Sequence, residues 1–141
     1  MVSAPGWRIA NHLPLVYLPS EWRGVNVQTY QYQHTGIGPT GESFDVFGDG
    51  SLLQIHTAGH ATGMSATMVR GRDGRYVLLA ADVGYANRSW EEMLTPGICT
   101  SRNAAITSLG WMRESAHDPQ CIEALANHDP HTDQHVLTLA Y

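Results

Sequence analysis

The sequence of 141 residues contains no lysine, little charge of either sign and no long hydrophobic run. Its eight basic residues are outnumbered by 13 acidic ones, and the formal net charge of −5 argues against nucleic acid as a partner. No apolar stretch reaches the roughly 18 to 20 residues that cross a bilayer, and the N-terminus lacks the basic segment and apolar core of a signal peptide. We therefore expect a cytoplasmic protein that binds neither nucleic acid nor membrane.

Cysteine is also scarce, whereas histidine is abundant. Cys99 and Cys121 form no C-x-x-C motif, so they are predicted to be small buried hydrophobic residues rather than a redox pair. The hydrophobic content of 43% and the chain length suffice for the core of one domain. The sequence has eight histidines, as many as it has arginines. Histidine is the commonest metal ligand and the usual proton shuttle, so this abundance is a reason to look for a site.

Glycine and proline divide the chain into short periodic segments. Residues 1–24 are predicted to be irregular, and the alternation over 25–32 indicates an edge strand. Five further strands are predicted near 44–47, 51–56, 65–70, 75–81 and 121–126. The apolar spacing in 101–117 predicts an amphipathic helix, after a shorter helix within 87–94. This order predicts an α/β fold with a mixed sheet and helices on one of its faces.

Three polar residues share one kind of position in this pattern. His60, Asp82 and His128 each follow a predicted strand, and strand ends of a mixed sheet meet at one edge. Two imidazoles and a carboxylate suit a divalent metal, and a bridging carboxylate suits a pair of metals. Gly59 and Gly63 on either side of His60 permit backbone angles and close approaches that a side chain would forbid.

Each of these residues alone has an ordinary structural explanation. A single histidine at a strand end is usually a hydrogen-bonded surface residue, and an aspartate after a strand is usually a turn or helix cap. Tyr85 alone would be a half-buried packing residue. It is the ordered set of three, each ending an apolar strand, that favours a functional site.

The motifs around these residues resemble the N-acyl homoserine lactonases of the metallo-β-lactamase superfamily over roughly residues 15–141. The family's T-P-G-H-x-x-G-H segment corresponds to "TAGHATGM" at 57–64, its D-x-x-Y to "DVGY" at 82–85 and its G-H-D to "NHD" at 127–129. The resemblance implies that His60 binds one metal ion and His128 another, with Asp82 bridging them. It also implies that Tyr85 hydrogen-bonds the lactone carbonyl. The cofactors would be two divalent ions of the zinc or iron class, expected to be zinc, and the activity would be opening of the lactone ring of N-acyl homoserine lactones (quorum quenching).

The sequence departs from the family pattern at several positions. Ala58, Met64 and Asn127 replace a proline, a histidine and a glycine of the family motifs. The family's H-x-H-x-D-H motif is absent. The resemblance therefore implies that residues 1–141 are the C-terminal half of an αββα sandwich, inactive alone. A complementary N-terminal half or a homo-oligomer would then complete the site.

Two alternatives remain open from the sequence. The tail "HDPHTDQH" at 128–135 is predicted mainly to be a solvated loop, although its histidines could replace missing ligands. The function could instead be that of a non-catalytic half-domain that serves as a binding or assembly module, or of a hydrolase of another ester or thioester. In each enzymatic case the substrate would be a small lactone or ester.

Overall fold

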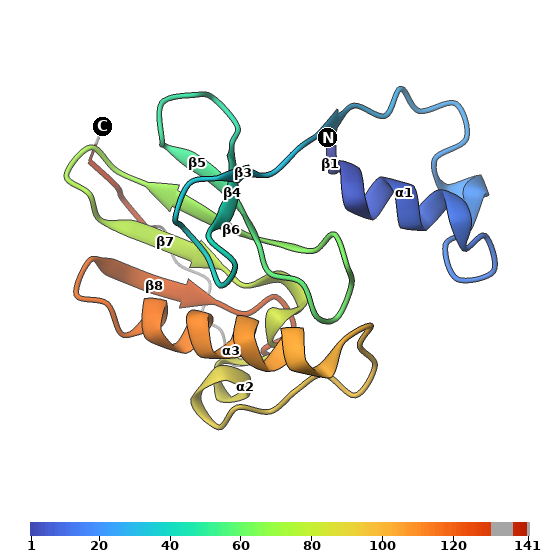
Figure 1. Cartoon of the computed structure of the whole chain (residues 1–141). Helices are drawn as coiled ribbons and strands as arrows, with labels where there is room; N and C mark the ends of the chain where they lie inside the picture. The colour runs from blue at the N-terminus through green and yellow to red at the C-terminus, as the bar shows by residue number, and fades with distance from the viewer. Residues whose placement is uncertain (131–136, 141) are drawn as a thin grey trace.

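The computed structural model describes residues 1–130 and 137–140, and its main body is a six-stranded mixed sheet (Figure 1). The strands, in spatial order, are β3 (Gln33–His34), β4 (Glu42–Asp45), β5 (Leu52–His56), β6 (Ser65–Arg70), β7 (Tyr76–Leu79) and β8 (Cys121–Leu125). Neighbours pair antiparallel except β7 and β8, which are parallel. Because β6 is antiparallel to both of its neighbours, β5, β7 and β8 run in one direction and end at the same edge of the sheet.

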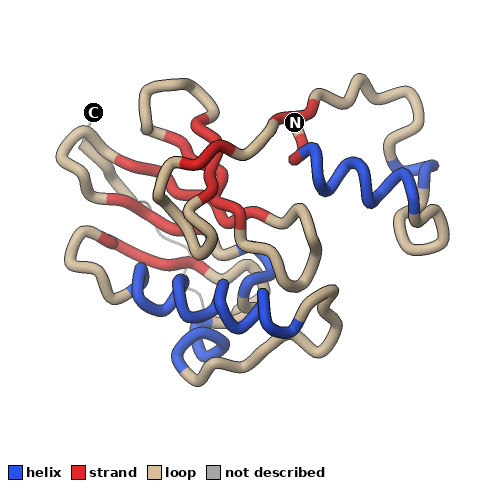
Figure 2. Tube along the Cα trace, viewed as in Figure 1, coloured by secondary structure: helices blue, strands red, loops and turns tan. Residues whose placement is uncertain are grey.

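Two helices connect β7 to β8 and lie on one face of the sheet. Figure 2 shows α2 (Asn87–Glu91) and α3 (Arg102–Ala116) together on that face. The α3 helix begins after Ser101, whose hydroxyl accepts the Ala104 N–H at 3.3 Å. The predicted helix over 101–117 and the predicted mixed sheet with helices on one face are both confirmed.

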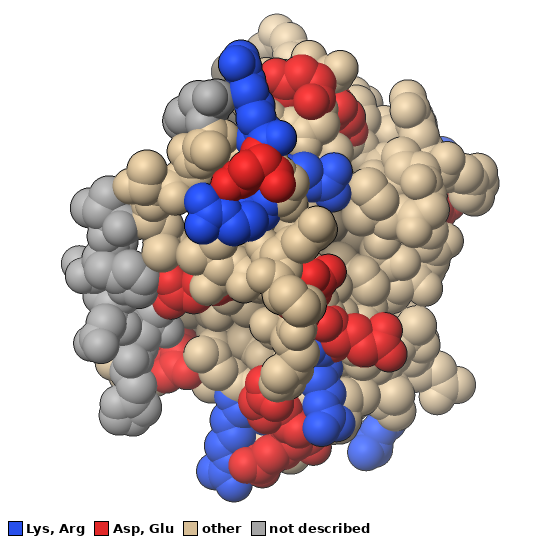
Figure 3. Space-filling view, turned by 90° about the vertical axis from the view of Figure 1, so that its left-hand side faces the viewer, with Lys and Arg blue, Asp and Glu red and all other residues tan. Residues whose placement is uncertain are grey.

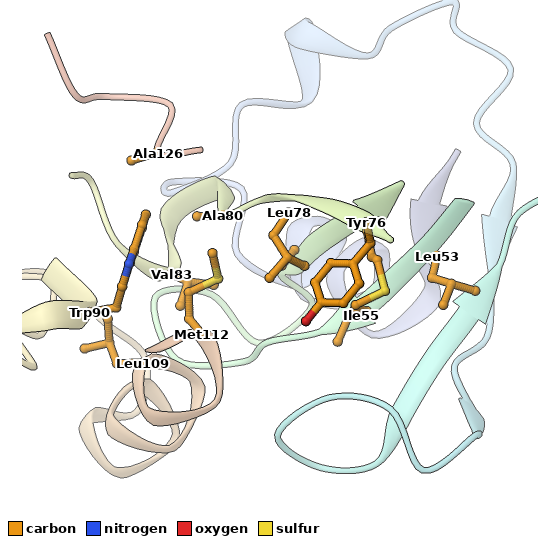
Figure 4. Close-up of a cluster of buried hydrophobic side chains, with 12 residues drawn as sticks. Leu53, Ile55, Tyr76, Leu78, Ala80, Val83, Trp90, Leu109, Met112 and Ala126 are labelled. Atoms are coloured by element: carbon orange, nitrogen blue, oxygen red, sulfur yellow. The ribbon is translucent and has the colours of Figure 1, made fainter. Parts of the chain in front are cut away.

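The core lies between α3 and the sheet (Figure 4). In β5 the alternation points Leu53 and Ile55 into this core, to which α3 contributes Leu109 and Met112. Ile55, Leu109 and Met112 have no exposed surface. Full burial of such side chains contributes about 1.5–3 kcal/mol each, so this layer anchors the strand ends that carry the polar residues.

Both predicted hairpins form, with small shifts of the strand ends. The β4 strand ends at Asp45 rather than at 47, because its carboxylate accepts the N–H groups of Gly48 and Gly50 at 3.0 and 2.7 Å and so turns the chain. The β7 strand ends at Leu79 rather than at 81, because the 3₁₀ helix η2 (Ala81–Val83) follows. The described residues 137–140 form no strand.

The N-terminal segment differs from the prediction. Residues 1–24 were expected to be irregular, but they contain helix α1 (Ala4–His12) and the 3₁₀ helix η1 (Pro19–Glu21). Pro5 lies in the first turn of α1, where its missing N–H costs nothing, and the Ser3 side chain accepts the Gly6 N–H. The predicted edge strand over 25–32 reduces to β2 (Thr29–Tyr30), which pairs in parallel with β1 (Val2–Ser3).

Some charged groups on the surface form pairs of opposite sign. Arg75 contacts Asp73 at 2.6 Å and Arg88 contacts Glu92 at 2.5 Å. Figure 3 shows acidic and basic side chains side by side over one face of the molecule. Within residues 1–130 and 137–140, no helix is long and apolar enough to cross a membrane.

Candidate functional site

The structure brings all four sequence-predicted site residues together. His60 lies in the loop after β5, Asp82 lies in η2 after β7, Tyr85 follows η2, and His128 follows β8. Because β5, β7 and β8 end at one edge of the sheet, these segments meet there. The predicted convergence at one edge is confirmed.

Asp82 is the centre of this group. Its Oδ1 lies 3.1 Å from Nε2 of His128, and its Oδ2 lies 3.5 Å from Nε2 of His60. The side chains of Asp82 and His60 are 34% and 27% exposed, so a small molecule can reach both. The two oxygens of one carboxylate thus face two imidazoles that come from different strand ends.

The orientation of His60 is fixed by a backbone carbonyl. Its Nδ1 lies 2.8 Å from the Ile98 carbonyl oxygen, which can only accept, so Nδ1 carries the proton. In the neutral ring Nε2 then presents a lone pair towards Asp82. Two atoms that carry lone pairs repel each other unless a cation or a proton lies between them. A hydrogen bond from the other ring nitrogen to a backbone carbonyl, like the one from Nδ1 of His60 to Ile98, is typical of metal-binding histidines. His60 and Asp82 therefore have the chemistry of metal ligands and could supply part of the ligand set of a divalent metal ion.

Tyr85 stands between the two imidazoles. Its ring makes edge contacts with His60 and His128, at centroid distances of 6.1 and 5.1 Å. The hydroxyl lies 3.5 Å from Nδ1 of His60, which is a long contact, and the residue is 38% exposed. The phenolic O–H can therefore donate to an oxygen atom of a bound molecule.

The glycines beside His60 are required by close backbone contacts. A Cβ on Gly59 would lie 2.5 Å from Cα of Ala105 in α3, and a Cβ on Gly63 would lie 2.3 Å from Cα of Gly6 in α1. Gly59 also has φ of +151°, and its carbonyl accepts the Thr100 N–H at 2.8 Å. The loop that carries His60 is thus held against α3 on one side and α1 on the other, as the glycines had predicted.

The backbone is also unusual directly before Asp82. Ala81 has φ of +50°, and Asp82 has φ of −91° and ψ of 22°, in the sparsely populated bridge region. A non-glycine residue with positive φ costs of order 1–3 kcal/mol and persists where the surrounding structure enforces it. Here the η2 turn directs the Asp82 carboxylate towards both histidines.

Sequence reasoning missed two groups of the site. Asn127 donates from Nδ2 to Oδ1 of Asp82 at 3.5 Å, and the Ile98 carbonyl orients His60. Of these two groups, only Asn127 had a signal in the sequence, because it directly precedes His128. Within the described part of the chain, no group of three or more His, Cys, Asp or Glu side chains is arranged to hold a metal ion, so the contacts at Asp82 are two pairs with one shared member. Residues 131–135 of the predicted solvated tail lie outside the described residues.

Comparison with known proteins agrees with the resemblance to the N-acyl homoserine lactonases that the sequence motifs indicated. No family model matches the sequence. The chain is 35% identical over 95 residues to the N-acyl homoserine lactonase AttM of Rhizobium radiobacter and 32% identical over 93 residues to that of Rhizobium johnstonii. Each match covers 66% of this chain and 35% of the relative, so the aligned part spans about a third of the curated relatives' length.

Solved structures share the fold over a larger part of the chain. An N-acyl homoserine lactone hydrolase with N-hexanoyl-L-homoserine bound at its catalytic metal centre matches with a TM-score of 0.65 and 17% identity. A variant of AiiA from B. thuringiensis with N-decanoyl-L-homoserine bound at the active site matches equally well. Both matches cover 92% of this chain and 46% of the solved chain.

Proposed function

Since this chain is similar in sequence to the N-acyl homoserine lactonases over about two thirds of its length, and shares a fold with them, we propose that its site opens the lactone ring of N-acyl homoserine lactones. The observation that carries the proposal is the arrangement at Asp82. Its two carboxylate oxygens face Nε2 of His60 and Nε2 of His128, and Tyr85 lies between the imidazoles. These residues would form one part of a metal-dependent hydrolase site.

The metal ions would be divalent, and zinc suits the imidazole and carboxylate ligands. His60 would hold one ion and His128 a second, with Asp82 shared between them. Such ions polarise an ester carbonyl and activate water for attack. The hydrogen bond from Nδ1 of His60 to the Ile98 carbonyl favours the neutral tautomer whose Nε2 carries the lone pair that a metal ligand would need.

Tyr85 would bind the carbonyl oxygen of the lactone. Negative charge develops on this oxygen when the ring is attacked, and a positioned O–H donor stabilises that charge more than it stabilises the uncharged substrate. The edge contacts with both histidines hold the Tyr85 ring, while the long contact to His60 leaves its proton available. Loss of one such donor typically lowers the rate about 10²- to 10³-fold.

The test is hydrolysis of N-hexanoyl-L-homoserine lactone by this chain together with a segment bearing the H-x-H-x-D-H motif, supplied in the same polypeptide. Asp82→Ala should abolish activity and reduce metal content. Tyr85→Phe should lower kcat and leave metal content unchanged, because it removes a donor and no ligand. Full lactonase activity with Asp82→Ala would show that this carboxylate is not at the reacting centre. Hydrolysis of simple esters or thioesters in preference to lactones would assign the site to a different substrate.

A further inference from the structure

His56, the last residue of β5, has a hydrogen-bond acceptor at each ring nitrogen. Its Nδ1 lies 2.9 Å from Oε2 of Glu42 in β4, and its Nε2 lies 3.0 Å from the carbonyl oxygen of Thr62, which can only accept. The contact with His56 lowers the pKa of the Glu42 carboxyl group, so this group is ionised near neutral pH and also only accepts. Both ring nitrogens must therefore carry a proton, which makes His56 an imidazolium cation.

The surroundings of His56 suit a cation. The ring of Tyr32 stacks on the imidazole at a centroid distance of 4.4 Å and an interplanar angle of 18°, which places the π face of the phenol ring against the charge. The side chain of His56 is 15% exposed, and that of Glu42 is 30% exposed. The ion pair is thus partly shielded from water, and hydrogen bonds to charged groups are stronger than those between neutral groups.

The Thr62 carbonyl belongs to the loop that carries His60. This loop runs from Thr57 to Met64, and its two ends are joined by a hydrogen bond from the Thr57 N–H to the Met64 carbonyl at 3.0 Å. His56 directly precedes the loop and reaches over six residues to its far side. The imidazolium thereby ties the loop to β4. A neutral ring has only one N–H, so it could keep only one of the two contacts.

We propose that His56 is a positioning residue whose doubly protonated ring holds this loop in the conformation that presents His60 to Asp82. Thr62 lies two residues after His60, so displacement of the Thr62 carbonyl would change the contact of 3.5 Å between Nε2 of His60 and Oδ2 of Asp82. The part of the inference that concerns metal binding rests on the proposed function, whereas the part that concerns the loop does not.

The first test is amide hydrogen exchange of the 141-residue chain without metal, followed by NMR in the parent and in His56→Gln. The Thr57 N–H reports opening of the loop, and the Ala80 N–H, which donates to the Leu125 carbonyl at 2.8 Å, reports opening of the sheet. A glutamine side chain cannot reproduce the two opposed N–H donors. Because Thr62 is exposed to water, we expect roughly tenfold faster exchange at Thr57 and at most about a threefold change at Ala80.

The matched control is His117→Gln. Nδ1 of His117 lies 2.8 Å from the Arg113 carbonyl and Nε2 lies 3.4 Å from Glu91, so this histidine has the same two kinds of partner, but neither belongs to the loop. Its substitution should leave exchange at Thr57 unchanged. Equal acceleration at Thr57 in both variants would overturn the proposal.

The ¹⁵N NMR spectrum of the His56 ring tests the protonation state directly. Both nitrogens should show the chemical shift of a protonated nitrogen at pH 7, and a nitrogen with a free lone pair would overturn the proposal. Equal acceleration of exchange at Thr57 and Ala80 in His56→Gln would also overturn it, because His56 would then support the fold as a whole.

A zinc titration separates this inference from the proposed function. The Nε2 resonance of His60 should need roughly tenfold more Zn²⁺ to shift in His56→Gln than in the parent chain, and no more in His117→Gln. A parent chain in which Zn²⁺ never shifts this resonance, with the exchange result as expected, would reject the proposed metal site and retain the tie to the loop. An unchanged zinc requirement combined with faster exchange at Thr57 would show that the tie does not position His60 and would overturn the proposal.

Discussion

Gly59→Ala tests the reason for the glycine before His60. The new Cβ would lie 2.5 Å from Cα and 2.7 Å from N of Ala105, so the α3 backbone or the loop must shift by about an ångström to reach normal contact. Such overpacking costs about 1–3 kcal/mol. The φ of +151° at this position adds about 1–3 kcal/mol for a residue with a side chain. The free energy of unfolding should fall by about 2–6 kcal/mol.

Urea denaturation followed by tryptophan fluorescence measures this loss. With a slope of about 2 kcal/mol per molar urea, the midpoint should fall by about 1–3 M, or the variant should be unfolded without urea. Gly97→Ala is the matched control, because a Cβ there meets nothing within 4 Å and φ is not in the left-handed region. Its stability should stay within about 1 kcal/mol of the parent. Equal stability of the two variants would refute the close approach of the His60 loop to α3.

Two further predictions concern titratable groups away from the site. A hydrogen bond with His56 at 2.9 Å lowers the pKa of the Glu42 carboxyl group. The pair therefore stabilises the fold at pH values above the ordinary carboxyl pKa, and this stabilisation is lost as the pH falls through the lowered pKa. Glu42→Gln should therefore reduce the decrease in Tm between pH 6 and pH 3, and an unchanged acid profile would contradict the contact. Burial raises the pKa of the Cys121 thiol to about 11, which leaves roughly one thiolate in a thousand at pH 8. In a Cys99→Ser variant, iodoacetamide should label Cys121 about 100-fold more slowly than an unfolded cysteine, and labelling at the rate of the denatured protein would show that the thiol is not buried.

Much of the sheet and the meeting of the site residues could be predicted from sequence. The β6 strand pairs antiparallel with both β5 and β7, so β5 and β7 run in the same direction, and the crossover through α3 makes β8 parallel to β7. That topology alone places the segments after β5, β7 and β8 at one edge. The predicted group of His60, Asp82 and His128 therefore followed from strand order and required no information about side-chain packing.

The N-terminal segment and the second-sphere contacts could not be predicted in this way. Pro5 and Gly6 interrupt any periodic pattern, and whether they end a helix or begin one depends on the hydrogen bond between the Gly6 N–H and the Ser3 side chain. The Ile98 carbonyl belongs to the backbone, so residue type carries no signal for its contact with His60. The packing of the N-terminal segment on the loop that carries His60 is a tertiary contact between distant segments, so the local sequence does not encode it.

The central claim is that Asp82 joins His60 and His128 into part of a metal site, and zinc titration followed by long-range ¹H–¹⁵N NMR of the imidazoles tests it most directly. The resonances of Nε2 of His60 and His128 should shift together as Zn²⁺ is added, while Nδ1 of His60 stays protonated. His117, whose Nε2 lies 3.4 Å from Glu91, is an internal control for a surface histidine–carboxylate pair and should shift much less. Asp82→Ala should remove the response of both site histidines. An equal response at His117, or an unchanged response in Asp82→Ala, would contradict the claim.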